Sequence, residues 1–421
     1  MKEYYRFLSA DLLSQFSSGV MLSAISWYAI SWYKSNSLVS NLTNTNLLSG
    51  LLITVLIIPI IDKIKENKII QISLLIKTLM ILSSIICCTL FKDIKIGLFI
   101  IALANGISWN IYFPASKKFI QNISNIEELN KNNSLSETIM QIGLFSSGLI
   151  SGILLKYTNI IKILYLILLL SFISTLLSIT LKKHSNNKKN KNNINNKYSN
   201  YSNNYIYLLL IGIVLYIPFV GANEINTILP GNNYIYLLLI GIVLYIPFVG
   251  ANEINTILPG YVTEILKGNS IIYGSIDMMY GIGAILSGVL VSYLYKKIKE
   301  TNIVKYIFIC SIIIGVILSI NKSIIISYTL LFILGIIGPS IRIIINTLTM
   351  KTVNSKSIGK LMSIWNIISI LLQILLIKAL GNIMDSYGAN KGFILYSITM
   401  IIGLIITLFI FRKDKYNNIK K

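Results

Sequence analysis

Long runs of apolar residues, separated by short polar stretches, extend from one end of the chain to the other. The run 164–181 contains no charged residue, and the run 303–320 contains only Lys305. About 18 such residues are enough to cross the hydrocarbon core of a bilayer as a helix, whereas membrane β-strands alternate over about ten residues. The pattern therefore predicts an all-α membrane protein.

The apolar runs predict twelve membrane-spanning helices. Polar or charged residues separate most of the runs, but the stretch 205–260 contains enough apolar residues for one span or for two. With one span counted there, the predicted helices are 7–33, 42–61, 69–91, 96–116, 135–155, 161–181, one within 205–260, 271–294, 303–320, 324–348, 358–380 and 392–411.

Basic residues lie in short clusters between the apolar runs and give the chain a formal net charge of +22. With a cytoplasmic N-terminus, 26 lysines and arginines fall in cytoplasmic segments and 8 in external ones. This bias follows the positive-inside rule, and anionic lipids supply the opposite charge. We therefore expect a multi-pass protein of the cell membrane with both termini cytoplasmic and membrane lipids as partners. No single basic face or domain indicates a nucleic-acid partner.

A perfect tandem repeat lies in the middle of the chain, where residues 203–231 recur without change at 232–260. Such identity indicates a recent in-frame duplication or an error of sequence assembly. The second copy runs directly into the eighth span, so we expect it to form the seventh helix. The first copy is then an extra segment at the cytoplasmic interface. If both copies crossed the membrane, every later loop would change side.

The predicted spans fall into two halves of six. The tract 182–204 between them is rich in Asn and Lys and cannot build a core, so it is predicted to be a flexible cytoplasmic linker. Without one repeat copy, Pro114 and Pro339 are 196 residues apart, half of the 392 that remain. Parallel six-span halves are typical of one large transporter architecture. The predicted units are 1–181, a six-helix bundle; 182–204, the linker; 205–231, the extra copy; and 232–421, a second six-helix bundle.

Three stretches resemble the major facilitator superfamily, and within it the macrolide and multidrug efflux type of drug:proton antiporter. The opening FLSADLLSQFSSGVMLSAISWYAISW is similar to the first helix of those exporters. In the loop after the second span, the acidic residue of the family motif, Asp62, and the basic residue that follows it, Lys63, are present, but both glycines of the motif are missing. The fifth span matches the antiporter motif loosely, without its proline, at Gly143, Ser147, Gly148, Ser151 and Gly152.

The resemblance implies a twelve-span major facilitator fold that acts as a monomer. It also implies proton-coupled export of a small amphipathic compound, with the loop at Asp62 and Lys63 gating the cytoplasmic side. In this fold, helices 1, 4, 7 and 10 line the central cavity. The polar or aromatic residues placed there are Asp11, Asn105, Trp109, Asn110, Glu253 (with its copy Glu224) and Arg342, and Asp277 follows one span later.

Placing an ionisable group inside a membrane span costs free energy, so each ionisable residue among these is expected to have a functional or structural role there. Asp11, Glu253 and Asp277 are candidates to carry the coupled proton, because a poorly hydrated carboxylate binds a proton more readily than one in water. Hydration from the cytoplasm and helix capping are the alternatives. Arg342 is either a fixed partner for an acid or an anchor for an anion. Lys77 lies deep in a span, and the sequence assigns it no partner.

Other classes of protein find little support in the residues. His184, the only histidine, lies in the linker, and the three cysteines suggest neither a disulfide framework nor a metal site. No P-loop is present to bind ATP. We therefore expect no enzyme activity and no cofactor, and we expect transport of a small molecule driven by an ion gradient. An importer or metallophore transporter of the same fold, or a non-transporting membrane protein, remains the alternative.

Overall fold

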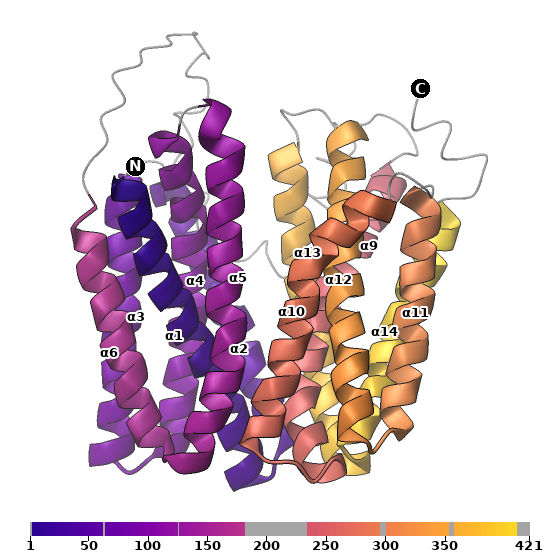
Figure 1. Ribbon diagram of the computed structural model, residues 1–421, viewed down its shortest axis with the longest axis horizontal. Coiled ribbons are helices and arrows are strands. Elements are labelled where there is room, and N and C mark those ends of the chain that lie inside the picture. Colours follow the sequence, from indigo (N-terminus) through magenta and orange to yellow (C-terminus); the bar gives the residue numbers. More distant parts are fainter. Residues whose placement is uncertain are drawn as a thin grey trace.

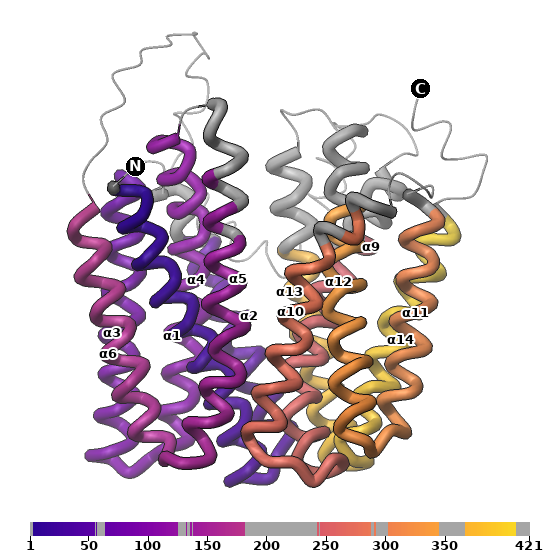
Figure 2. Tube along the Cα trace, viewed as in Figure 1, coloured from indigo at the N-terminus to yellow at the C-terminus, as the bar shows by residue number. Residues whose placement is uncertain are grey.

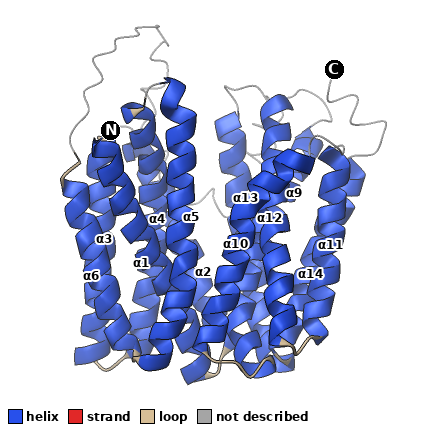
Figure 3. Ribbon diagram, viewed as in Figure 1, coloured by secondary structure: helices blue, strands red, loops and turns tan. Residues whose placement is uncertain are grey.

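The computed structural model describes residues 2–61, 64–124, 126–181, 234–294, 300–352 and 358–410, and these residues form helices without a strand (Figure 3). In the first half the helices are α1 (Lys2–Tyr33), α2 (Asn36–Ile61), α3 (Glu66–Leu90), α4 (Ile94–Ile123), α5 (Ile126–Tyr157) and α6 (Ile160–Ile179). In the second half they are α9 (Tyr234–Gly260), α10 (Ser270–Leu294), α11 (Glu300–Ile320), α12 (Ile324–Thr352), α13 (Ile358–Tyr387) and α14 (Gly392–Ile410), with a short π-helix η1 (Tyr261–Ile265) and a 3-10 helix η2 (Ala389–Lys391).

The all-α prediction is confirmed, and every predicted span corresponds to one of these helices. The second repeat copy forms α9. The predicted linker 182–204, the first repeat copy and the predicted gating residues Asp62 and Lys63 lie outside the described residues.

The twelve helices pack as two bundles that lie side by side (Figures 1 and 2). Helices α1–α6 pack mainly on one another, as do α9–α14. Two helix pairs make most of the contact between the bundles: α5 packs against α10, and α2 packs against α13. The bundles are close together at the end where α1 is followed by α2, and their helices diverge toward the end where the chain begins (Figure 1).

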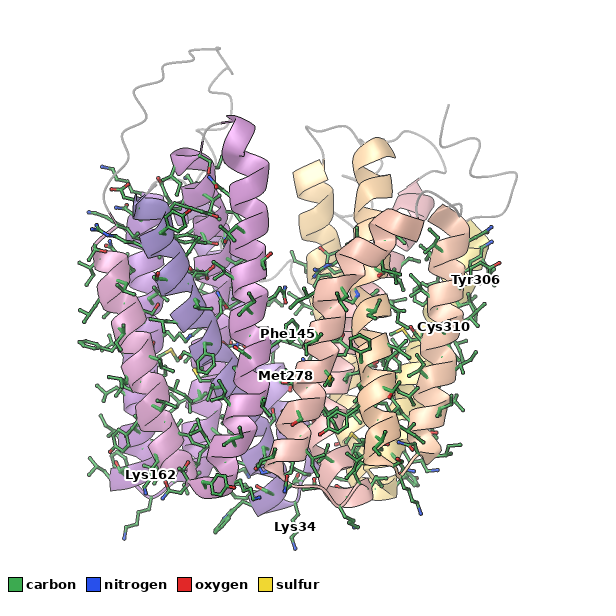
Figure 4. The ribbon with its side chains drawn as sticks, in the orientation of Figure 1. Lys34, Phe145, Lys162, Met278, Tyr306 and Cys310 are labelled. Atoms are coloured by element: carbon green, nitrogen blue, oxygen red, sulfur yellow. The ribbon has the colours of Figure 1, made fainter. Side chains whose placement is uncertain are left out.

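The outer faces of the molecule are apolar. Large exposed apolar side chains gather on α3, α6, α11 and α14, among them Leu79, Leu169 and Ile405. Tyr306 and Cys310 point away from the bundle on α11 (Figure 4). Among the described residues, nine helices are long and apolar enough to cross a membrane. Exposed apolar surface of this extent fits lipid and not water, so the chain is a multi-pass membrane protein.

Short polar side chains tie the helices together inside each bundle. The hydroxyl of Ser73 on α3 donates to the carbonyl of Ser108 on α4 at 3.0 Å. Thr78, also on α3, is within 2.8 Å of the Ser171 hydroxyl and 3.0 Å of the Thr175 hydroxyl on α6. Such bonds between membrane helices each contribute about 0.6 kcal/mol, and the small residues also allow close packing.

Candidate functional site

Asp11 lies in the interior of the N-terminal bundle. Its side chain is only 3% exposed. Tyr112 Oη on α4 and Gln15 Nε2 on α1 both donate to Asp11 Oδ1 at 2.9 Å. The carboxyl group is therefore held by neighbouring side chains, which does not favour the alternative in which water from the cytoplasm hydrates it.

Lys77 on α3 belongs to the same buried region, and its partners are found on α1. Its ammonium group donates to the Ser14 carbonyl at 2.8 Å and to the Ser18 hydroxyl at 2.7 Å. An electrostatic interaction also links it to Asp11. Lys77 is 1% exposed, so these contacts replace the hydration that the charge loses. The first helix thus presents an acid and a set of hydroxyl and carbonyl oxygens to α3 and α4.

Asn105 and Asn110 of α4 face α2. Asn105 Nδ2 donates to Asn46 Oδ1 at 3.3 Å, and Asn110 Oδ1 accepts from the Thr54 hydroxyl at 3.2 Å. Trp109 is partly buried and stacks on Phe113, one turn further along α4, with ring centroids 5.3 Å apart. The expected cavity residues of the fourth helix therefore divide into an amide pair against α2 and an aromatic pair.

Glu253 is fully buried in the C-terminal bundle, between α9 and α14. The Thr399 hydroxyl donates to its Oε1 at 2.9 Å. Its second oxygen, Oε2, is buried and has no hydrogen-bond partner among the described residues. A small cavity lies close by; its lining includes the next residue, Ile254, together with Gly250, Tyr280, Ser311, Gly338 and Tyr396, but not Glu253 itself. A buried carboxyl group with one satisfied and one unsatisfied oxygen is suited to gaining and losing a proton.

Asp277 lies where the two bundles meet. It is partly buried on α10, and the Ser23 hydroxyl of α1 approaches its Oδ2 at 3.5 Å. Four residues earlier, Tyr273 stacks on Trp27 of α1 with ring centroids 5.3 Å apart. Asp277 also borders Gly148 of α5. It is the only one of the three candidate proton carriers for which the described contacts reach the opposite bundle.

Arg342 lies on α12 among aromatic side chains of the C-terminal bundle. Its guanidinium carbon is 4.8 Å from the centre of the Phe248 ring, a cation–π distance. Its charge also acts on the hydroxyl groups of Tyr245 and Tyr280. Gly338 and Ile341, just before Arg342, line the cavity close to Glu253. This arrangement gives α9 and α12 a cationic and aromatic surface.

The structure does not bring the predicted residues into a single cluster. Glu253 lies seven residues before the end of α9, which η1 continues, and Asp277 lies seven residues after the start of α10. Their hydrogen-bond partners belong to different helices, α14 and α1. Asp11 lies nearer the opposite end, within the N-terminal bundle.

The glycines of the fifth helix serve two different interfaces. Gly143 packs against α1 at Gln15 and the Leu12 carbonyl. Gly148 and Gly152 pack against α10, where the Ser270 hydroxyl donates to the Gly152 carbonyl at 2.6 Å. Phe145 and Met278 lie between the same two helices (Figure 4). The motif read from the sequence is thus a set of close contacts within and between the bundles.

Sequence reasoning did not find the polar contacts that join the bundles through α2. Lys378 of α13 donates to Asn41 Oδ1 at 2.8 Å, and Asn44 Nδ2 donates to the Ile374 carbonyl at 3.1 Å. Asp385 of α13 and Glu264 of η1 also accept hydrogen bonds from the start of α2. One signal was available: α2 carries four asparagines, at 36, 41, 44 and 46, in an otherwise apolar span.

Two six-helix bundles with apolar outer faces and a buried polar interior define a polytopic membrane protein of the transporter type. The family model described as Major Facilitator Superfamily matches residues 7–376. The chain belongs to the Major Facilitator Superfamily, and it is a membrane transporter of that fold. Members of this family are generally not enzymes.

Solved structures of transporters are similar to the whole chain. The nucleoside transporter NupG aligns with a TM-score of 0.68 and 12% identity, covering 98% of this chain and 100% of its own. A D-xylose-proton symporter aligns with a TM-score of 0.72 and 12% identity, covering 97% of this chain and 96% of its own. A bacterial homologue of the iron transporter ferroportin, in an inward-facing state, aligns with a TM-score of 0.70 and 11% identity, covering 97% of this chain and 98% of its own. At this identity the likeness shows the fold alone. No curated protein matches the chain.

Proposed function

We propose that the protein is a proton-coupled secondary transporter that exports a small amphipathic compound across the cell membrane. The observation that carries the proposal is Glu253, a fully buried carboxyl group whose oxygen Oε2 finds no hydrogen-bond partner in the part of the chain that the structure describes. It lies on α9, the helix whose counterparts line the central cavity in the resembling family.

Proton coupling requires a group whose protonation depends on the state of the transporter. An ionised carboxyl group in a dry membrane interior is costly, so Glu253 exchanges its proton only when a rearrangement lets water reach it. The cavity close to it is bounded by five helices, α9, α10, α11, α12 and α14, so a shift of these helices changes that access. The structural relative named as a D-xylose-proton symporter supports proton coupling on this fold.

The surroundings of Arg342 and Trp109 support an amphipathic substrate. Arg342 with Phe248 on one bundle and Trp109 with Phe113 on the other offer aromatic faces beside polar groups. Ligand sites of this kind are mostly apolar, with a few polar groups that fix orientation. The outward direction of transport, the cytoplasmic termini, the monomeric state and the gating role of Asp62 and Lys63 follow from the sequence resemblance and the charge bias.

Transport into sealed inside-out membrane vesicles tests the proposal. The vesicles are given an acidic interior and a mixture of amphipathic aromatic dyes, each quantified by mass spectrometry. We expect at least one dye to accumulate only when the protein is present and to be released by a protonophore. Accumulation only in right-side-out vesicles with an acidic exterior would instead identify an importer. No protein-dependent accumulation in either orientation would contradict the proposal.

A further inference from the structure

The first turn of α2 is capped by a residue of the other bundle. The backbone N–H groups of Asn36 and Ser37 donate to Oδ1 and Oδ2 of Asp385, at 2.6 and 3.0 Å. The Ser35 hydroxyl approaches Oδ2 at 3.4 Å. The first N–H groups of a helix have no partner within the helix, and a carboxylate there also complements the helix dipole. Asp385, near the end of α13, supplies both functions across the bundle interface.

A second acid connects the same turn to the C-terminal bundle. Asn36 Nδ2 donates to Glu264 Oε1 at 2.8 Å, and the backbone N–H of Ala389 donates to Glu264 Oε2 at 3.0 Å. The turn before Ala389 depends on Gly388, whose φ of 94° suits glycine. Asn36 is 1% exposed, so this contact is inside the interface and not on its rim.

The backbones are also in close contact at this point. A Cβ atom added at Gly260 would overlap Asn36 Oδ1, and one added at Gly381 would overlap the Ser40 hydroxyl. The glycines at the end of α9 and in α13 therefore let α2 come close enough for Asp385 and Glu264 to reach it. The polar contacts and the tight packing depend on the same closed arrangement of the bundles.

We propose that Asn36, Ser37, Glu264 and Asp385 form an interbundle latch that holds this end of the transporter closed. A transporter of this fold must open each end in turn, and opening this end separates α2 from α13. Two N–H groups of α2 then lose their carboxylate partner, so Asp385 sets part of the free-energy difference between the two states. The proposal rests on the family of the chain and does not depend on its substrate or coupling ion.

The chain contains a matched control for Asp385. Asp93 Oδ1 accepts from the backbone N–H of Ile96 at 2.9 Å and so caps α4. The loop that contains Asp93 joins α3 to α4 at the same end of the molecule (Figure 1). Both residues are acids that cap a helix at this end, but only Asp385 caps a helix of the other bundle. Removal of Asp93 costs a helix cap without loosening the interface.

The reporter of opening is a cysteine at position 40. Ser40 is fully buried on α2 against Gly381, and its hydroxyl donates only to the Ser37 carbonyl one turn before, so Ser40→Cys is a mild change. The three natural cysteines, Cys87, Cys88 and Cys310, are first replaced by alanine. The protein is purified in lipid nanodiscs, and the rate of labelling by a maleimide that does not enter lipid is measured.

In this background Asp385→Ala is expected to raise the labelling rate at least several-fold. Asp385→Asn keeps one acceptor oxygen and should give an intermediate rate, and Asp93→Ala should leave the rate unchanged. Size-exclusion profiles identify any variant that fails to fold, and the Asn variant keeps the test available if the Ala variant is lost. Equal rates in all folded variants, or equal increases for Asp93 and Asp385, would overturn the latch.

Discussion

Asp11 shows how a charged side chain is accommodated in the membrane interior. Tyr112 and Gln15 donate to one of its oxygens, and Lys77 lies in the same buried region with partners on α1. Gln15 is one turn along the same helix, whereas Tyr112 and Lys77 come from α4 and α3, so most of the cost of burial is offset by tertiary contacts between helices. The same contacts make the α1–α3–α4 interface sensitive to single polar substitutions.

The hydrogen bond from Tyr112 gives a prediction at this scale. Tyr112→Phe removes only the hydroxyl that donates to Asp11. Bonds of this kind in membrane proteins contribute about 0.6 kcal/mol on average and up to about 1.7. The variant should therefore unfold at a lower temperature in detergent, by differential scanning fluorimetry. Tyr306→Phe, on the exposed face of α11, is the control and should be unchanged.

The positions of the intramembrane charges could be read from the sequence, but their partners could not. Hydropathy places Lys77 and Lys378 within spans because the flanking residues are apolar. Ser14 and Ser18, which hold Lys77, are on another helix, as is Asn41, which accepts from Lys378. One helix rotated by a third of a turn would give each lysine different neighbours, and no local pattern fixes that rotation.

At the scale of the helix, α5 and α10 meet through small residues. A Cβ added at Gly274 would overlap the carbonyl oxygen of Gly148, which belongs to a helix backbone and cannot turn away. The glycines thus determine how closely the two bundles approach on this side. The helix-five motif noted in the sequence identified the α5 half of this contact, and Gly274 had no comparable signal.

Substitution of these glycines separates packing from helix propensity. Gly274→Ala should lower the unfolding temperature and loosen the α5–α10 contact, because the new methyl group forces the helices apart. Gly338→Ala is the matched change, since its Cβ would meet only the Tyr280 hydroxyl at 3.6 Å. In a helix, alanine is favoured over glycine by about 1 kcal/mol, so Gly338→Ala should be neutral or stabilising. Equal destabilisation by both substitutions would argue against the close contact.

The repeat gives a second prediction for a single element. The second copy provides α9, which packs against α12, α13 and α14. Deletion of 203–231 removes the first copy and should leave the amount of inserted protein and its transport unchanged or improved. Expression measured by fluorescence in a C-terminal fusion, followed by the vesicle assay, checks this. A deletion variant that inserts but does not transport would assign the first copy a role.

At the scale of the molecule, the length of the apolar runs was sufficient to predict an all-α membrane protein of twelve spans, and the resemblance to the family added the two-bundle fold. Helix ends were predicted less well: the fifth span was expected at 135–155, and α5 covers Ile126–Tyr157. Its polar first residues continue the helix beyond the hydrophobic layer, where hydropathy gives no signal. The contacts between bundles could not be predicted, because they join residues far apart in the chain, such as Gly152 and Ser270, 118 positions apart, or Asn36 and Asp385, 349 positions apart.

The orientation of the molecule follows from the charge bias and can be tested directly. Lys34 and Lys162 lie at the end where the bundles are joined, which is the predicted external end (Figure 4). Single cysteines at Lys65, Asn193 and Lys415 should be protected from impermeant reagents in intact cells, and a cysteine at Lys162 should be labelled. External labelling at Asn193 would reverse the predicted orientation.

Proton coupling through Glu253 is the central claim, and Glu253→Gln tests it most directly. The amide keeps the bond from Thr399 but cannot change its charge. With the dye that the wild-type protein accumulates, the variant should lose accumulation driven by a pH gradient and retain exchange between labelled and unlabelled dye, which needs no proton release. Loss of both activities in a folded variant would indicate a structural role only. Undiminished gradient-driven accumulation at every pH would contradict the account.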